Sequence, residues 1–301
     1  MERNVEEIGA KMDALGLWDA LASYNWAVKP HGTAFPYFCT VVNGGEDAVK
    51  VRFMMLEGWN TLHDFVRMRA DSAFGVVSSP IELPHFELVV LAGGGTKLFR
   101  HDTGYMPREA EGPGRDIAAK ILWEAYGVML RVESDPRLPM RFADEKSIFA
   151  RVEDKSGAWR DEPLVIPDPP PYVERISFRT EDVKKAKDLP IVSTEVLDVD
   201  FRLVPVVMTR EKRPRCVYEL VAVDPVAKTR VVGMRTSVVP EAGLKAMWES
   251  MPQQLLAQFL ARGRVPGRIR VVSQRVFRFI RPLGMELPFR ISLHDSLPDL
   301  A

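Results

Sequence analysis

Cysteine is scarce in this chain, and long apolar runs are missing. The 301 residues include two cysteines, Cys39 and Cys216, each inside an apolar strand-like segment. Two separated thiols exclude a disulfide framework and a cysteine-based metal knuckle, so we expect both to be buried structural residues. No segment approaches the ~20 consecutive apolar residues of a membrane span. We therefore predict no membrane contact and, because residues 1–4 open an acidic helix instead of a secretory signal, a cytoplasmic location.

Histidine pairs and cofactor fingerprints are also missing. The triple glycine Gly93, Gly94 and Gly95 leads into strand-like residues 97–100 instead of the helix that a nucleotide-binding loop requires, so we interpret it as a hairpin turn. The sequence therefore predicts no metal and no cofactor, and it leaves open a metal site assembled only in three dimensions. The five histidines show neither i, i+4 pairing nor a nearby cysteine or carboxylate cluster at ligand spacing: His31, His63, His85, His101 and His294.

Net charge is zero, with 41 basic and 41 acidic side chains, but the charges are unevenly distributed. Residues 201–301 hold seventeen lysines and arginines against eight acidic residues. Such asymmetry indicates contact with a polyanion or another charged partner. No acidic residue occurs between Glu249 and Glu286, a segment that contains seven arginines: Arg262, Arg264, Arg268, Arg270, Arg275, Arg278 and Arg281.

Proline marks the expected domain boundary. Residues 156–175 contain Pro163, Pro167 and the run 169–171, and consecutive prolines favour an extended, stiff backbone without ladder hydrogen bonds. We predict an N-terminal module at residues 1–155, a proline-rich linker at 156–175 and a C-terminal module at 176–301. The alternative is a proline-rich strap that lies over the surface of one larger domain.

The N-terminal module mixes helical and strand periodicities, which predicts a small α+β unit. Asn43-Gly44-Gly45 separates two strand-like runs and is a strong hairpin signal, because these residues tolerate positive φ. The expected helices cover residues 5–23, 59–68 and 115–131, and the expected strands cover 36–42, 48–56 and 87–91.

The C-terminal module has a more definite pattern, namely three strands, helix, strand, helix, strand. We expect strands at 196–207, 215–223, 230–238, 268–272 and 289–293 and helices near 240–260 and 275–283, with Val265-Pro266-Gly267 as a turn. This order matches the ribonuclease-H-like arrangement, in which an antiparallel three-strand meander precedes parallel strands joined by crossover helices. The predicted fold class is therefore α+β, with a small α+β module followed by a ribonuclease-H-like α/β module.

Nucleases of that topology hold two metal ions with carboxylates, so such an enzyme would carry acidic residues at the ends of the expected strands. Asp198 and Asp200 lie on the first strand of this module, and Asp224 closes the second. The strand at 268–272 carries arginines where a carboxylate is expected. These three aspartates are weak catalytic candidates, and the alternative function is a variant metal-dependent nuclease.

The arginine segment favours a non-enzymatic binding or adaptor protein. Arg268 and Arg270 alternate with apolar residues and share a strand face, whereas Arg275 and Arg278 share a helix face. Together with Arg264 they form the candidate polyanion-binding set, because the guanidinium fork suits bidentate contact with phosphate or carboxylate. The partner would be nucleic acid or an acidic protein surface. Two rival explanations are docking of the acidic N-terminal module onto these arginines and a general abundance of arginine.

Four passages, at residues 122–129, 149–164, 213–218 and 264–300, carry a resemblance that covers nearly the full length of the chain. Through them the chain resembles a bacterial family of uncharacterised proteins that joins two domains of unknown function. The resemblance implies a two-module layout and no established activity, substrate or cofactor.

Overall fold

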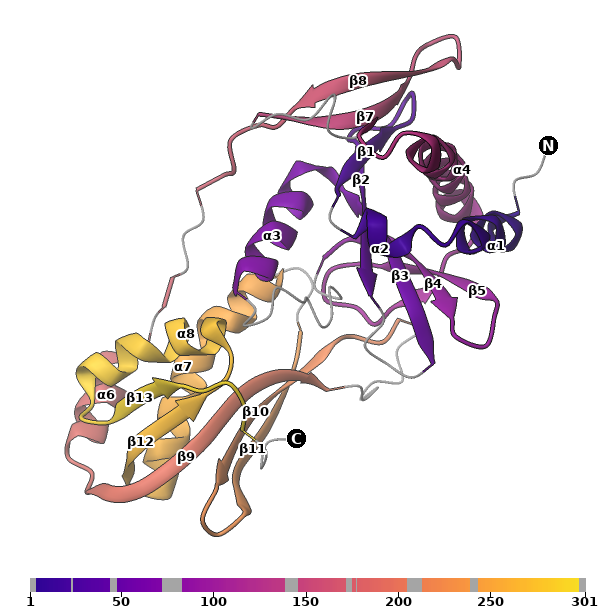
Figure 1. The fold of residues 1–301 in the computed structure, drawn as a ribbon. Helices are drawn as coiled ribbons and strands as arrows, with labels where there is room; N and C mark the ends of the chain where they lie inside the picture. The colour runs from indigo at the N-terminus through magenta and orange to yellow at the C-terminus, as the bar shows by residue number, and fades with distance from the viewer. Residues whose placement is uncertain are drawn as a thin grey trace. The chain divides into compact units, whose positions relative to one another are not determined.

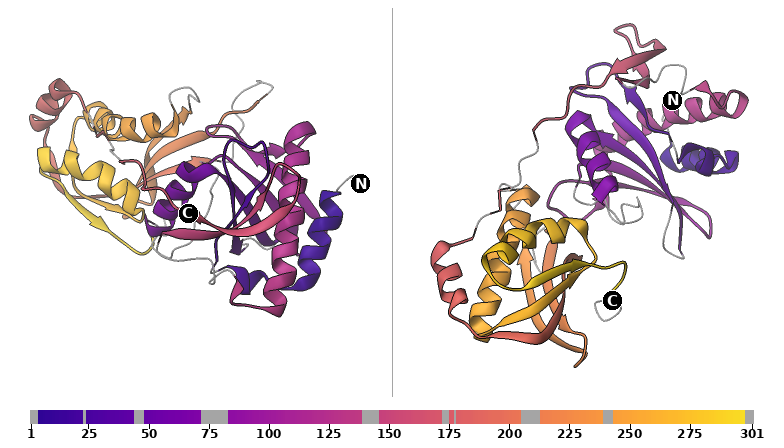
Figure 2. Two further views of the ribbon diagram at one scale, coloured as in Figure 1. Left: turned by 90° about the horizontal axis from the view of Figure 1, so that it is seen from above. Right: turned by 60° about the vertical axis from the view of Figure 1, so that its left-hand side comes forward.

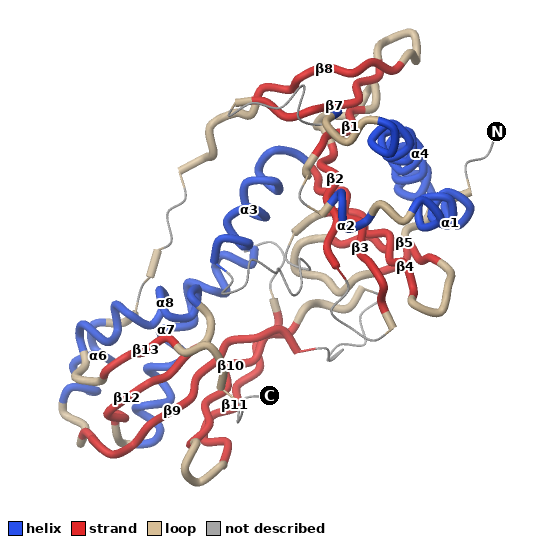
Figure 3. Tube along the Cα trace, viewed as in Figure 1, coloured by secondary structure: helices blue, strands red, loops and turns tan. Residues whose placement is uncertain are grey.

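The computed structural model describes residues 4–22, 24–43, 48–71, 83–138, 146–171, 175–176, 178–204, 213–238 and 243–297. The chain divides into two compact units. The first comprises Met1–Arg67, Val77–Asp102 and Pro107–Pro171, and the second comprises Met68–Val76, Thr103–Met106 and Tyr172–Ala301. Over the described residues, seven helices and two mixed sheets make this a mixed α+β protein (Figures 1 and 3). None of these helices has the length and apolar content to cross a membrane.

The first unit is built on a sheet with the strand order β6-β5-β4-β3-β2-β1-β7-β8. Neighbouring strands are antiparallel except for β1 and β7, which are parallel. The strands are β1 (Trp26–Lys29), β2 (Tyr37–Asn43), β3 (Val49–Glu57), β4 (His85–Leu91), β5 (Thr96–His101), β6 (Arg108–Glu109), β7 (Ser147–Glu153) and β8 (Trp159–Val165). The tip of the predicted β2–β3 hairpin, Gly44 and Gly45, lies outside the described residues.

Helices pack on both faces of this sheet. Helices α1 (Val5–Leu15) and α4 (Gly112–Ser134) lie on one side and α3 (Gly58–Asp71) on the other (Figures 1 and 2). The main core lies between the sheet and α1 and α4, and it includes Met12, Phe53, Leu88 and Leu122. On the other face, Trp59 of α3 packs against Phe38 of β2, with ring centroids 4.6 Å apart.

Two sequence predictions for this unit were wrong. The helix expected at residues 5–23 ends at Leu15, because Gly16 adopts a left-handed conformation with φ 64°, and α2 (Trp18–Leu21) follows as a separate turn. The predicted linker contains β8, which pairs with β7 at the edge of the sheet. Pro163 is compatible with this position, since an edge strand has backbone groups that need no ladder partner.

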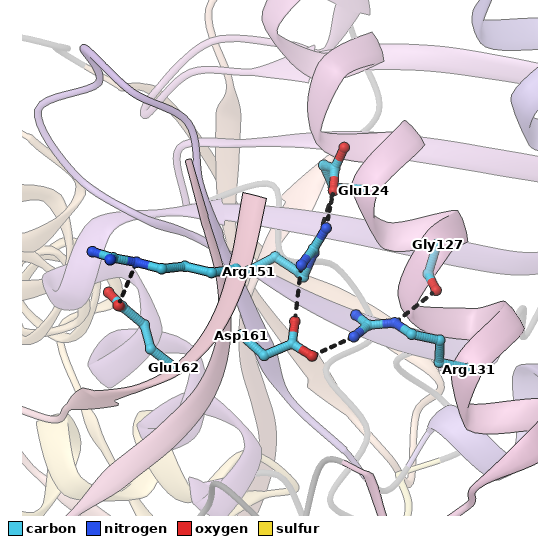
Figure 4. A network of polar contacts seen from close by, with 7 residues as sticks. Glu124, Gly127, Arg131, Arg151, Asp161 and Glu162 are labelled. Carbon is cyan, nitrogen blue, oxygen red and sulfur yellow. Dashed lines mark hydrogen bonds and ion pairs between the residues drawn. The ribbon is translucent and has the colours of Figure 1, made fainter. Parts of the chain in front are cut away.

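An ion-pair network fastens β7 and β8 to α4 (Figure 4). Arg151 of β7 contacts both Glu124 of α4, at 3.1 Å, and Asp161 of β8, at 3.1 Å. Arg131 of α4 contacts the second oxygen of Asp161 and donates to the carbonyl of Gly127. Residues 159–165 are therefore an integral part of the first unit.

The second unit is a sheet with the order β11-β10-β9-β12-β13 and three helices. Strands β9, β10 and β11 form an antiparallel meander, whereas β12 and β13 run parallel to β9. The elements are α6 (Thr180–Lys187), β9 (Ile191–Val204), β10 (Val217–Asp224), β11 (Thr229–Ser237), α7 (Gly243–Arg262), β12 (Val265–Val271), α8 (Gln274–Glu286) and β13 (Arg290–Leu293). From β9 onward they follow the predicted order, and α7 continues through Pro252.

Helices α7 and α8 cover one face of the second sheet. Trp248 of α7 packs against Phe201 of β9, Tyr218 of β10 and Phe279 of α8. Ile269 of β12 pairs in register with Leu197 of β9, on the same face as Phe201. Because strand side chains alternate, Arg268 and Arg270 point to the opposite face.

The predicted turn at Val265-Pro266-Gly267 was wrong, because these residues begin β12. The β9–β12 register shifts between Pro266 and Arg268, which marks a β-bulge. A Cβ atom on Gly267 would lie 2.5 Å from the carbonyl oxygen of Ser193, so the backbones approach more closely than any other residue allows.

Candidate functional site

The five predicted polyanion-binding arginines do not converge on one surface. Arg268 and Arg270 lie on β12 and point away from α7 and α8. Arg275 and Arg278 lie on α8, which covers the other face of the sheet, and Arg264 precedes β12. A single groove formed by all five side chains is therefore not present.

Arg264, Arg270 and Arg275 make contacts within the second unit. Arg264 and its neighbour Arg262 both contact Glu195 of β9. Arg270 holds Asp198 of β9 side-on, with Nε 2.6 Å from Oδ1 and Nη2 2.7 Å from Oδ2. Arg275 stacks on Trp248, its Cζ atom 4.0 Å from the ring centroid. The acids that neutralise the arginine segment thus come from β9 of the same unit.

Arg268 and Arg290 remain as an exposed pair. They are directly opposite each other on the parallel strands β12 and β13, and both are exposed. Among the residues that the structure describes, no carboxylate lies within ion-pair distance of either guanidinium. Like charges in register repel, so this pair costs stability in the isolated chain.

The three candidate catalytic aspartates have different hydrogen-bond partners. Asp198 is fully buried, and Arg270 holds both of its oxygens. Asp224 accepts hydrogen bonds from the backbone N–H groups of Val226 and Ala227 and thereby caps the β10–β11 turn. In the described part of the chain, these aspartates do not form a three-ligand group of the kind that holds a metal ion.

Asp200 differs from the other two because, among the described residues, it forms no ion pair with an arginine or lysine, and it is half-buried. Burial raises the pKa of its carboxyl group, although a hydrogen bond from the backbone N–H of Phe201 partly opposes the effect. Perturbed carboxyl groups occur at functional sites and also at purely structural positions.

A cluster that the sequence did not predict lies in the first unit, where His85, Glu87 and His101 bring three metal-binding side chains together. His85 and Glu87 share one face of β4, and His101 of β5 is directly opposite His85. Phe86 and Leu88, which alternate with His85 and Glu87 along β4, face the main core on the side of α1 and α4. The cluster therefore lies on the other face of the sheet, which α3 covers. All three side chains are buried, with exposed fractions of 0%, 1% and 5%.

Hydrogen bonds fix the positions of these groups. His85 Nδ1 lies 2.7 Å from the carbonyl oxygen of Leu83, and His101 Nε2 lies 3.0 Å from Glu87 Oε2. The second side of the Glu87 carboxylate faces Arg52, whose Nη1 atom is 3.2 Å from Oε1. The two imidazole rings are stacked, with centroids 4.0 Å apart and planes inclined by 18°.

The surroundings keep Glu87 ionised and His85 neutral. Burial alone would raise the pKa of Glu87, but the hydrogen bond from His101 and the charges of His101 and Arg52 lower it to about 2. Burial, and next to it the charge of His101, lowers the pKa of His85 to about 3. At neutral pH, an ionised carboxylate therefore stands beside an uncharged imidazole.

The predicted hairpin contained the signal that would have found this cluster. With the turn at Gly93–Gly95, Val90 pairs with Thr96 and Leu88 pairs with Leu98. The same register continued outward places His85 opposite His101, with Glu87 one alternation away. Pairing along the chain at i, i+4 detects only ligands on a single helix, so it missed ligands on two strands.

Comparisons with known proteins concern the second unit. Residues 182–301 match a family described as a domain of unknown function, DUF6930. The match begins within α6 and spans the whole β9–β13 sheet. No curated protein matches the chain. The family description names no activity, ligand or partner.

Proposed function

We propose that the chain is a non-enzymatic binding or adaptor protein whose second unit docks an acidic protein surface. The observation that carries this proposal is the exposed pair Arg268 and Arg290, in register on β12 and β13 and on the face opposite α7 and α8. Their mutual repulsion would be relieved by carboxylates of a partner, so binding and local stability would improve together.

An acidic protein suits this surface better than nucleic acid does. Single-stranded nucleic acids are held by aromatic side chains on which the bases stack. Among the described residues, the large exposed apolar side chains of the second unit are aliphatic: Ile191, Val226, Met285 and Leu293.

The alternative is a variant metal-dependent nuclease of ribonuclease-H-like topology. The order β11-β10-β9-β12-β13, with a meander followed by two parallel strands, supports that topology for the second unit. The raised pKa of Asp200 supports a reactive carboxyl group. We favour binding because Asp198 is held by Arg270 and Asp224 by a turn, which leaves a metal ion few ligands.

The test compares the double variant Arg268→Glu/Arg290→Glu with the single variants and with Arg281→Glu. Arg281 is an exposed arginine on α8, so its reversal changes the net charge without touching the proposed surface. The probe is fluorescently labelled polyglutamate, and its polarisation is measured with the full chain at low salt. We expect binding that weakens as salt rises and an affinity about tenfold lower in the double variant, since each exposed ion pair contributes up to about 1 kcal/mol.

Three results would contradict the proposal. Arg281→Glu could weaken binding as much as Arg268→Glu does, which would mean that net charge alone governs the interaction. Labelled oligouridylate could bind while polyglutamate does not, which would point to nucleic acid. Magnesium or manganese could raise the melting temperature of the wild type and not of Asp200→Ala, which would favour the nuclease.

A further inference from the structure

His85 leaves one buried ring nitrogen without a partner. A carbonyl oxygen only accepts hydrogen bonds, so the contact with Leu83 places the proton of the neutral ring on Nδ1. Nε2 then carries a lone pair, and it is buried with no hydrogen-bond partner among the described residues. A ring N–H bonded to a backbone carbonyl, with the other nitrogen bare, is the arrangement by which proteins orient metal-binding histidines.

His101 repeats this pattern on the neighbouring strand. Its Nε2 faces the ionised carboxylate of Glu87, which accepts a hydrogen bond, and its Nδ1 is buried without a partner in the described part of the chain. Unpaired buried nitrogens are costly, about 1–3 kcal/mol each. Two such nitrogens lie in adjacent rings, next to a buried carboxylate. This arrangement indicates a binding site for a ligand that is not part of the chain.

The donor set matches a transition metal of borderline softness. Two imidazoles and one carboxylate bind zinc at many protein sites, whereas magnesium and calcium prefer sites made of oxygen atoms. To bind a metal ion through Oε2, Glu87 must give up the contacts of that oxygen with His101 Nε2 and Arg52 Nη1, while Oε1 keeps its own contact with Arg52, which then serves as an outer-shell partner. The charge of Glu87 offsets part of the charge of the cation.

The geometry requires only local movement. One donor atom from each residue lies within 4.8 Å of the others, whereas two ligands on a tetrahedral zinc ion lie roughly 3.3 Å apart, given Zn–N distances of about 2.0–2.1 Å. The imidazole rings must rotate out of their stack, because a metal ion lies in the plane of each ring that binds it. The backbone positions are already set by the β4–β5 register.

We propose that His85, Glu87 and His101 form a binding site for one divalent transition-metal ion, with zinc as the best-fitting ion. The three protein ligands leave a fourth coordination position for water or another small ligand. The site belongs to the first unit, whereas the arginine surface belongs to the second.

Zinc uptake by the full chain tests this proposal. Protein dialysed against a chelator is titrated with zinc by calorimetry, and its melting temperature is followed in parallel. We expect one ion per chain, a higher melting temperature in zinc, and affinity that falls in acid as protons compete for the ligands. His101→Gln should weaken binding by more than the about 10- to 100-fold that loss of an outer-shell partner costs.

Control variants separate ligand loss from misfolding. His31→Gln removes an exposed histidine of the same unit that is outside the cluster, so its zinc affinity should equal that of the wild type. Glu87→Gln keeps the shape of the side chain and should also bind weakly. Equal zinc affinity in wild type, His101→Gln and Glu87→Gln would overturn the proposal, as would the absence of zinc uptake by the wild type.

X-ray absorption of the zinc-loaded wild type gives an answer that does not depend on any variant. The proposal expects two imidazoles in the coordination sphere, with the remaining ligands oxygen. A sulfur ligand would point to Cys39 or Cys216, and an oxygen-only sphere would point to surface carboxylates. Either spectrum would overturn the assignment even if every substitution in the cluster prevented folding.

Discussion

At the scale of single residues, the contact between Arg270 and Asp198 places an ion pair against the interior of the second unit. Asp198 is fully buried, so its charge depends on the two hydrogen bonds from the guanidinium group. Replacing Arg270 by Met keeps much of the side-chain volume and removes the charge. We expect Arg270→Met to lower the free energy of unfolding by about 3–5 kcal/mol, the cost of leaving a buried charge unpaired.

Urea denaturation of four proteins measures this coupling. Asp198→Asn in the Arg270→Met background removes the unpaired charge, so the double variant should recover much of the lost stability. A loss below about 1 kcal/mol in Arg270→Met would mean that water reaches Asp198 and screens it. In that case Asp198 would again become a candidate metal ligand.

Asp200 makes the opposite contribution to stability. Burial raises its pKa in the folded state. Above that pKa the carboxyl group is ionised in the folded and in the unfolded protein, and burying the charge then lowers the free energy of unfolding. We expect Asp200→Asn to raise the melting temperature at pH 7 while preserving the hydrogen bond from Phe201. The gain should shrink as the pH falls below the folded-state pKa, since the wild-type carboxyl group then becomes neutral too. Melting curves at pH 7 and pH 3.5 measure this gain, and Asp168→Asn, at an exposed position, is the control. A gain in melting temperature that is the same at both pH values would contradict the prediction.

At the scale of elements, periodicity and turn residues predicted the second unit well. Strands β9, β10 and β11, helices α7 and α8 and strands β12 and β13 follow in the expected order, because apolar runs are separated by turn residues along this part of the sequence. The exact element ends depended on tertiary contacts. Pro266-Gly267 has the local chemistry of a turn, yet it lies in β12 because the sheet needs a bulge and a close approach to Ser193.

Strand β8 was missed for a related reason. It is an edge strand with mostly half-exposed and exposed residues, so it lacks the alternation that identifies a buried strand. Besides its pairing with β7, strand β8 is fixed to the first unit by ion pairs from Asp161 to Arg151 and Arg131, which are ten and thirty residues away along the chain. Contacts of that kind have no local pattern, and the same applies to the acids on β9 that neutralise the arginine segment.

For the candidate sites too, local features were predictable from the sequence and long-range contacts were not. The shared face of Arg268 and Arg270 on β12 was predictable from alternation, because Ile269 and Val271 are apolar and the two arginines are not. Their partners were not predictable, since Asp198 and Arg270 are 72 residues apart. The histidine cluster lies between these cases, because a hairpin register derived from the turn glycines would have paired His85 with His101.

At the scale of the whole molecule, the two units have separate apolar cores. The main core of the first unit includes Trp18 and Trp26, whereas the second unit packs around Trp248, Phe201 and Phe279. Of the six tryptophans, five belong to the first unit, and Trp248 is the single tryptophan of the second. The fluorescence difference between the wild type and Trp248→Phe therefore reports on the second unit alone.

Gly267→Ala uses this reporter to test whether the units unfold separately. The new Cβ atom would lie 2.5 Å from the carbonyl oxygen of Ser193, so β9 and β12 must move apart, at a cost of about 1–3 kcal/mol. We expect the denaturation midpoint of the Trp248 signal to fall while the signal of the other five tryptophans keeps its midpoint. Gly93→Ala is the matched control, because a Cβ atom there meets nothing within 4 Å. If Gly267→Ala shifted both signals equally, the two units would unfold as one cooperative structure, and zinc bound to the first unit would then stabilise the arginine surface of the second.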